Sequence, residues 1–65
     1  KNKKLLEKLH SARLKAGLTQ VEASKRLNKP QSYLSKIERG ERKIEAIELA
    51  DFAKLYKKSL DYFIS

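Results

Sequence analysis

The stretch Gln20–Gly40, QVEASKRLNKPQSYLSKIERG, predicts two short amphipathic helices separated by the turn Leu27-Asn28-Lys29-Pro30. The second of these helices has the apolar residues Leu34 and Ile37 on one side. Because successive helical residues are about 100° apart, its polar and basic residues fall on the opposite third of the circumference. These residues are Ser32, Ser35, Lys36 and Arg39. A short helix with apolar anchors and a polar, basic outer face has a shape suited to the major groove of DNA.

The first helix of the pair has clear start and stop signals. Thr19 and Glu22 form a T-x-x-E capping box, in which each side chain bonds to the backbone amide of the other residue. We therefore expect a helix over Gln20–Leu27. Asn28 tolerates the left-handed conformation that often ends a helix.

The second helix of the pair is expected over Pro30–Arg39. Pro30 suits the first helical turn, because an N–H group there would have no helical partner. Gly40 ends the helix, and residues 41–43 form an exposed basic turn.

Residues 4–16 also show the spacing of an amphipathic helix, and Gly17 can end it. Its predicted packed face consists of Leu5, Leu6, Leu9, Ala12, Arg13 and Ala16. Arg13 is the exception on this face. Either it pairs with a carboxylate, because an unpaired buried charge is very costly, or its stem packs while its charged head extends into solvent.

Two more helices follow, over about Ile44–Tyr56 and Leu60–Ile64, and Ser59 can cap the last one. The packed side of the fourth helix is expected to include Ile47, Ala50 or Asp51, Leu55, Phe52, Ala53 and Tyr56. No alternation typical of β-strands is found. The sequence therefore predicts an all-α fold of five helices, with residues 1–65 as a single domain.

Composition excludes several classes of function. There is no cysteine and only one histidine, His10, so we expect no metal site and no cofactor. The chain has no glycine-rich phosphate loop and no plausible nucleophile–base pair, so we do not expect an enzyme, and no small-molecule ligand is evident. Apolar runs are only two or three residues long, which predicts a cytoplasmic protein without a membrane helix or signal peptide. Since the first residue is Lys1 rather than Met, the sequence can also be part of a longer protein.

The net charge of +8 is unevenly distributed. Residues 1–16 have a balance of +5, residues 17–43 of +4, and residues 44–65 of −1. Such an excess can simply keep a protein soluble. Its concentration around the helix with the basic outer face favours a polyanionic partner.

Several motifs, in this order and spacing, resemble the Cro and phage-repressor type of helix-turn-helix domain, the XRE family. The matching residues are Arg13, Gly17-Leu18-Thr19-Gln20, Ser35-Lys36-Ile37-Glu38-Arg39-Gly40 and the closing Ser59-Leu60-Asp61-Tyr62-Phe63-Ile64. The resemblance covers residues 9–64 and implies a compact five-helix, lambda-repressor-like fold with a helix-turn-helix core at residues 20–39. In it, Gln20–Leu27 is the supporting helix and Pro30–Arg39 the recognition helix. It also implies a partly buried ion pair between Arg13 and Glu38.

Three features depart from the family pattern. Ala23 and Ser24 stand where the supporting helix usually has Leu and Ala, and Asn28 replaces the common glycine of the turn. Pro30 takes the place of a capping Ser or Thr. None of these changes breaks the motif. Ser24 is still small enough for the helix crossing, and the loss of the side-chain cap either loosens the start of the helix or is offset by Pro30, which fixes φ.

The resemblance also implies which residues contact DNA. Base contacts are expected from Gln31, Ser32, Ser35 and Lys36, and phosphate contacts from Gln20, Tyr33, Arg39, Arg42 and Lys43. Two of these have alternatives. Lys36 can instead contact a phosphate or be a solvated charge, and Tyr33 can pack on a thymine methyl group or be a half-buried structural residue.

The function implied is sequence-specific binding of double-stranded DNA by a transcriptional regulator, most simply a repressor. Such proteins commonly bind palindromic operators as dimers, and the expected dimer surface consists of Leu60, Tyr62, Phe63 and Ile64. The alternative for Tyr62 or Phe63 is that one of them closes the core. The alternative function is a protein-interaction module, such as an antitoxin or a transcriptional coactivator, and no membrane partner is expected.

Overall fold

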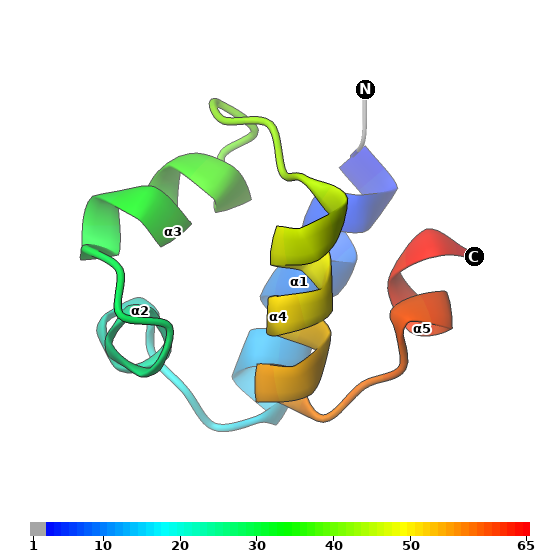
Figure 1. The fold of residues 1–65 in the computed structure, drawn as a ribbon, viewed down its shortest axis with the longest axis horizontal. Coiled ribbons are helices and arrows are strands. Elements are labelled where there is room, and N and C mark those ends of the chain that lie inside the picture. The colour runs from blue at the N-terminus through cyan, green and yellow to red at the C-terminus, as the bar shows by residue number, and fades with distance from the viewer. Residues whose placement is uncertain (1–2) are drawn as a thin grey trace.

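The computed structural model describes residues 3–65, which form five α-helices and no strand. The helices are α1 (Lys3–Lys15), α2 (Gln20–Arg26), α3 (Gln31–Glu38), α4 (Ala46–Tyr56) and α5 (Leu60–Ile64). The long helices α1 and α4 lie in the middle, with α2 and α3 on one side and α5 on the other (Figure 1). The predicted all-α fold with five helices is confirmed.

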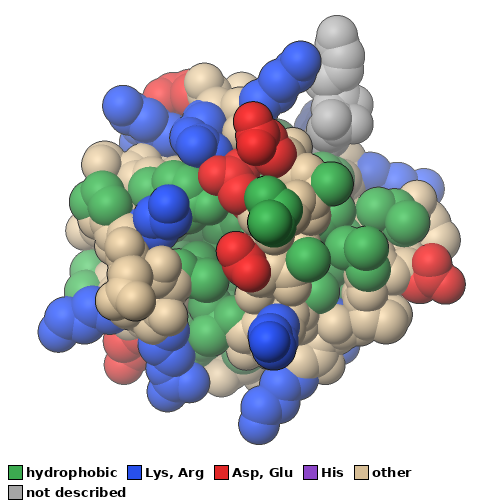
Figure 2. Space-filling model, in the orientation of Figure 1, with side chains coloured by type: hydrophobic (Ala, Val, Ile, Leu, Met, Phe, Trp, Pro, Cys, Tyr) green, Lys and Arg blue, Asp and Glu red, His purple; other side chains and the backbone are tan. Residues whose placement is uncertain are grey.

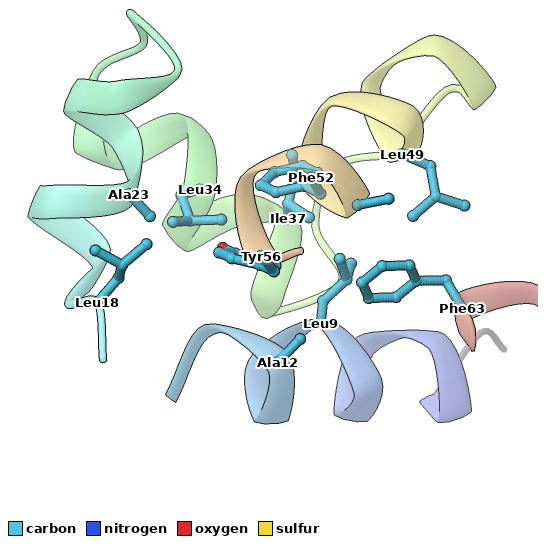
Figure 3. Close-up of a cluster of buried hydrophobic side chains, with 11 residues drawn as sticks. Leu9, Ala12, Leu18, Ala23, Leu34, Ile37, Leu49, Phe52, Tyr56 and Phe63 are labelled. Atoms are coloured by element: carbon cyan, nitrogen blue, oxygen red, sulfur yellow. The ribbon is translucent and has the colours of Figure 1, made fainter. Parts of the chain in front are cut away.

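All five helices contribute to one apolar core (Figure 3). The buried apolar residues are Leu9, Ala12, Leu18, Ala23, Leu34, Ile37, Leu49, Phe52, Ala53, Tyr56 and Phe63. Phe52 is completely buried, and its ring packs near those of Tyr33 and Tyr56, at centroid distances of 6.3 and 5.8 Å. Each large apolar side chain removed from water contributes about 1.5–3 kcal/mol, so a domain of this size depends on a few such residues.

Small residues allow α2 and α3 to pack closely. Ala23 and Ser24 of α2 are almost completely buried, as are Leu34 and Ile37 of α3. A larger side chain at the crossing would push the two helices apart. The small residues predicted for α2 and the apolar anchors predicted for α3 are therefore all buried, as expected.

Two helices begin later than predicted. Pro30 is the N-cap of α3 rather than its first helical residue, because its ψ of 156° is extended, and it provides no side-chain cap. The helix α4 begins at Ala46 because Glu45 and Glu48 form a second capping box, which the sequence analysis did not recognise. The other boundaries agree with the prediction or differ from it by one residue.

The packed face of α4 also differs from the prediction. Its buried residues are Leu49, Phe52, Ala53 and Tyr56, whose spacing gives one continuous helical stripe. Leu49 was not expected on this face, and the prediction for Ile47 is wrong, since 70% of this residue is exposed. Ala50 and Asp51 are exposed as well, and so is Ala16, which directly follows α1.

The C-cap of α4 offers a test of backbone strain. Lys57 has a φ of 58°, a left-handed conformation that is unfavourable for residues with a Cβ atom. We expect Lys57→Gly to raise the free energy of unfolding by about 0.5–1 kcal/mol, because relief of this strain exceeds the added freedom of the unfolded chain. Urea unfolding followed by circular dichroism measures the change. The control is Lys43→Gly, at an exposed lysine without positive φ, which should lower stability; a gain of equal size in both variants would contradict this explanation.

Candidate nucleic-acid interface

A tight turn joins α2 to α3. Asn28 has a φ of 59°, which is the left-handed conformation expected at the end of α2. The amide of Asn28 donates to the carbonyl of Lys25 at 3.0 Å, and that of Lys29 donates to the carbonyl of Ser24 at 2.9 Å. These bonds satisfy the last carbonyl groups of α2, so the chain turns at once and α3 crosses α2.

The outer face of α3 contains all four predicted base contacts. Gln31, Ser32 and Lys36 are exposed, and Ser35 is half-buried. The opposite face is buried in the core, and α3 lies at the edge of the molecule (Figure 1). The four side chains therefore lie on the solvent-facing side of α3, whose opposite side packs in the core.

Glu38, the last residue of α3, forms an ion pair with Arg13 of α1. Arg13 donates from Nε to Glu38 Oε2 at 2.8 Å and from Nη2 to Oε1 at 3.2 Å, and the two side chains are only 7% and 6% exposed. Arg13 Nη1 also donates to the carbonyl of Leu18 at 2.9 Å. The pair implied by the family resemblance is therefore formed, and it joins α1, the α1–α2 loop and α3.

Further hydrogen bonds decide the charge state of Glu38. Its burial by itself would raise the pKa of the carboxyl group. The hydrogen bonds from Arg13, Gln20 and His10 outweigh burial, so the pKa lies below its ordinary value of 4.5. Glu38 is therefore a buried carboxylate that is charged at neutral pH.

Gln20 connects this buried carboxylate to the outer face of α3. Its Nε2 donates to Glu38 Oε1 at 3.0 Å, and its Oε1 accepts from Gln31 Nε2 at 3.4 Å. A carboxylate can only accept hydrogen bonds, so Gln20 must present its amide nitrogen to Glu38 and its oxygen to Gln31. One N–H and the oxygen of the Gln31 amide then remain for a partner outside the protein.

A family model described as helix-turn-helix matches residues 9–63. The chain belongs to this family, the XRE type of helix-turn-helix protein. No curated protein and no solved structure gives a significant match. Membership supports a role in DNA binding and transcription regulation in general.

Basic side chains lie on all sides of this helix-turn-helix domain, including around α2, α3 and the following loop (Figure 2). Arg39 makes two hydrogen bonds of 3.1 Å to Glu41, and both side chains are more than half exposed. Exposed ion pairs contribute little, typically about 0.2–1 kcal/mol, so Arg39 can exchange Glu41 for a phosphate at small cost. Lys43 is exposed in the loop.

Two predicted phosphate contacts, Tyr33 and Arg42, are already bound within the protein. The hydroxyl of Tyr33 donates to Glu48 at 3.2 Å, and Arg42 Nη1 donates to the same carboxylate at 3.0 Å. Burial raises the pKa of Tyr33 to about 12, and the nearby charge of Glu48 adds to this shift. Tyr33 is half-buried, which agrees with its structural alternative.

The dimer surface predicted on α5 has fewer exposed residues than expected. Phe63 is only 3% exposed and belongs to the core, so it is corrected to a core residue, in line with the stated alternative. Leu60 and Ile64 are 43% and 64% exposed. Hydrophobic side chains gather over α4 and α5 (Figure 2). Ile47 of α4, which was predicted to be packed, is also exposed.

Other kinds of site are not seen in residues 3–65. That part of the chain has no cluster of three or more His, Asp or Glu residues that could hold a metal ion. It also has no helix with the length and apolar character needed to cross a membrane. His10 contacts Glu38 and Arg13 at 3.3 and 3.2 Å instead.

Glu48 is an important residue that was not predicted from the sequence. It binds to Tyr33, Arg42 and the backbone amide of Glu45. The E-x-x-E spacing of Glu45 and Glu48 was the available signal, because it is a variant of the capping box. Its contacts to α3 carry no local sequence signal.

The ion pair between Arg13 and Glu38 can be tested by a double-mutant cycle. We expect Arg13→Met alone to lower the free energy of unfolding by about 3–5 kcal/mol, because it leaves a buried carboxylate without its partner. The variant Arg13→Met/Glu38→Met should lose less than this single variant, since it leaves no buried charge. Chemical unfolding of the single and double variants measures the coupling. Losses that simply add would show that the two residues act independently.

Proposed function

We propose that this helix-turn-helix protein binds double-stranded DNA at specific sequences, with α3 in the major groove, and represses transcription. The observation that carries the proposal is the arrangement of α3. Its inner face is fixed by Leu34 and Ile37, which are 1% and 0% exposed, while its outer face presents hydrogen-bonding and basic side chains. A helix of this kind fits the width of the major groove.

Four side chains are proposed to read bases: Gln31, Ser32, Ser35 and Lys36. The free N–H and oxygen of Gln31 match adenine N7 and N6, and Lys36 can donate to guanine O6 or N7. Gln20 supports Gln31 through their hydrogen bond. Base preference is thus assigned to the first two turns of α3.

Phosphate contacts are proposed for Gln20, Arg39 and Lys43. Gln20 is at the N-terminal end of α2, where the helix dipole favours an anion. Arg39 and Lys43 lie at the other end of α3 and in the following loop. Contacts of this kind provide affinity and register but no sequence information.

We propose that the protein forms a dimer through α5, because a dimer recognises a longer DNA site than a single domain does. One recognition helix reads only a few base pairs, and two-fold dimers solve this by binding palindromic half-sites about one helical turn apart. The exposed Leu60 and Ile64, with the half-buried Tyr62, supply apolar surface for such contact. The same surface also supports a second candidate, binding of another protein as in an antitoxin or coactivator.

Selection of bound sequences from a random duplex pool tests the proposal. We expect an enriched motif with two inverted half-sites about 10 base pairs apart. Binding that depends on salt but enriches no sequence would contradict specific recognition. Absence of DNA binding even at low salt would favour the protein-interaction candidate.

The division between base and phosphate contacts gives a sharper prediction. Lys36→Ala should reduce discrimination at one base position by about 1–3 kcal/mol. Arg39→Ala should weaken binding to all duplexes alike and reduce the slope of log affinity against log salt by about 0.9. Binding titrations with the selected duplex and its single-base variants measure both effects. Uniform losses in both variants would remove Lys36 from the base contacts.

A further inference from the structure

One carboxylate joins three segments of the chain beside the recognition helix. Glu48, in the first turn of α4, accepts from the hydroxyl of Tyr33 in α3 at 3.2 Å. It accepts from Arg42 Nη1, in the loop after α3, at 3.0 and 3.1 Å from its two oxygens. It also accepts from the backbone amide of Glu45 at 2.9 Å. With its side chain only 14% exposed, Glu48 is a fixed point shared by α3, the loop and α4.

The ring of Tyr33 is held on several sides as well. It stacks on Phe52 of α4, with an interplanar angle of 9°. The guanidinium carbon of Arg42 and Nζ of Lys29 lie 4.8 and 5.1 Å from its centroid, within the range of cation–π attraction. Its hydroxyl bond to Glu48 fixes the position of the outer end of the side chain.

This anchor acts on the part of α3 that is proposed to read bases. Tyr33 directly follows Gln31 and Ser32, and the N-cap Pro30 supplies no side-chain hydrogen bond to this end of the helix. Leu34 and Ile37 hold α3 in the core, which includes residues of α4, and Tyr33 adds a stacked ring and a hydroxyl bond to α4. Small rotations of a helix displace its groove-facing side chains from the base edges, and recognition tolerates little misplacement.

We propose that Glu48 is a positioning residue for DNA recognition, and that it acts by holding Tyr33 and Arg42 so that the first turn of α3 keeps its orientation in the groove. This inference rests on the proposed DNA-binding function and deepens it. It also assigns Arg42 to the support of α3 rather than to phosphate contact, because its guanidinium is bound to Glu48 and lies over the ring of Tyr33.

The test compares base-preference profiles, measured as binding constants for the selected duplex and each of its single-base variants. The test variants are Tyr33→Phe, which removes only the hydroxyl, and Glu48→Ala. Their matched controls are Tyr56→Phe, which removes a buried hydroxyl of α4 that has no hydrogen-bond partner in residues 3–65, and Glu7→Ala, which removes an exposed carboxylate without an ion pair in the same residues. Circular dichroism establishes that each variant is folded.

For both test variants, we expect the ratio of binding constants between the selected duplex and its single-base variants to fall at the positions that face the first turn of α3. The expected fall is at least about five-fold, which corresponds to the lower end of the cost of one mismatched base pair. Glu48→Gln should largely restore the profile, since its amide oxygen still accepts a hydrogen bond from Tyr33. Arg42→Ala should leave the salt dependence unchanged, in contrast to Arg39→Ala.

Two results would overturn the inference about Glu48 and leave the proposed DNA-binding function intact. The base-preference profiles of the test variants could coincide with those of their controls, or the test variants could lose the same affinity for every duplex. A reduced salt slope for Arg42→Ala would return that residue to the phosphate contacts and overturn its assignment. If the unaltered protein enriches no sequence at all, the proposed function fails, and this inference fails with it.

Discussion

The buried ion pair between Arg13 and Glu38 is the interaction on which the rest of the interface depends. Both side chains are almost completely removed from solvent, and each buried charge would be very costly without the other. Burial of Glu38 is acceptable only because Arg13 and Gln20 complete its hydrogen bonds. The pair therefore fixes the C-terminal end of α3 against α1, and α3 can expose its outer face without losing its position.

The two ends of α3 are held by different means. Glu38 holds the C-terminal end inside the molecule, and Tyr33 holds the N-terminal end against Phe52 and Glu48 at the edge of α4. Gln20 hydrogen-bonds to Glu38 inside the molecule and to Gln31 on the outer face of α3. Ser35 and Lys36 lie between these two anchors, and Gln31 and Ser32 directly precede Tyr33. The two anchors explain how a helix of 8 residues can be oriented in a domain with a small core.

Local signals in the sequence predicted most of the fold. The capping box at Thr19 and Glu22 is formed as expected, because it involves only neighbouring residues. The buried stripe of α4 was predicted less well, since Ile47 and Leu49 are both apolar and only tertiary packing selects between them. The partners of Glu48 could not be predicted for the same reason, as they lie in segments far apart in the chain. The ion pair of Glu38 was expected only from the family resemblance.

The ionisation of Glu38 gives the most direct test of this account. In the folded protein its pKa should lie below the ordinary value of 4.5, because hydrogen bonds from Arg13 and Gln20 outweigh its burial. The contribution of the pair to stability is then present above that ordinary value and is lost as the pH falls through the lower, folded-state pKa. Following the ¹³C shift of the Glu38 carboxyl group by NMR during an acid titration measures this pKa. A midpoint below 4.5 is the predicted result; a midpoint at or above it would show that burial outweighs the hydrogen bonds and that the pair does not stabilise the charged form of Glu38.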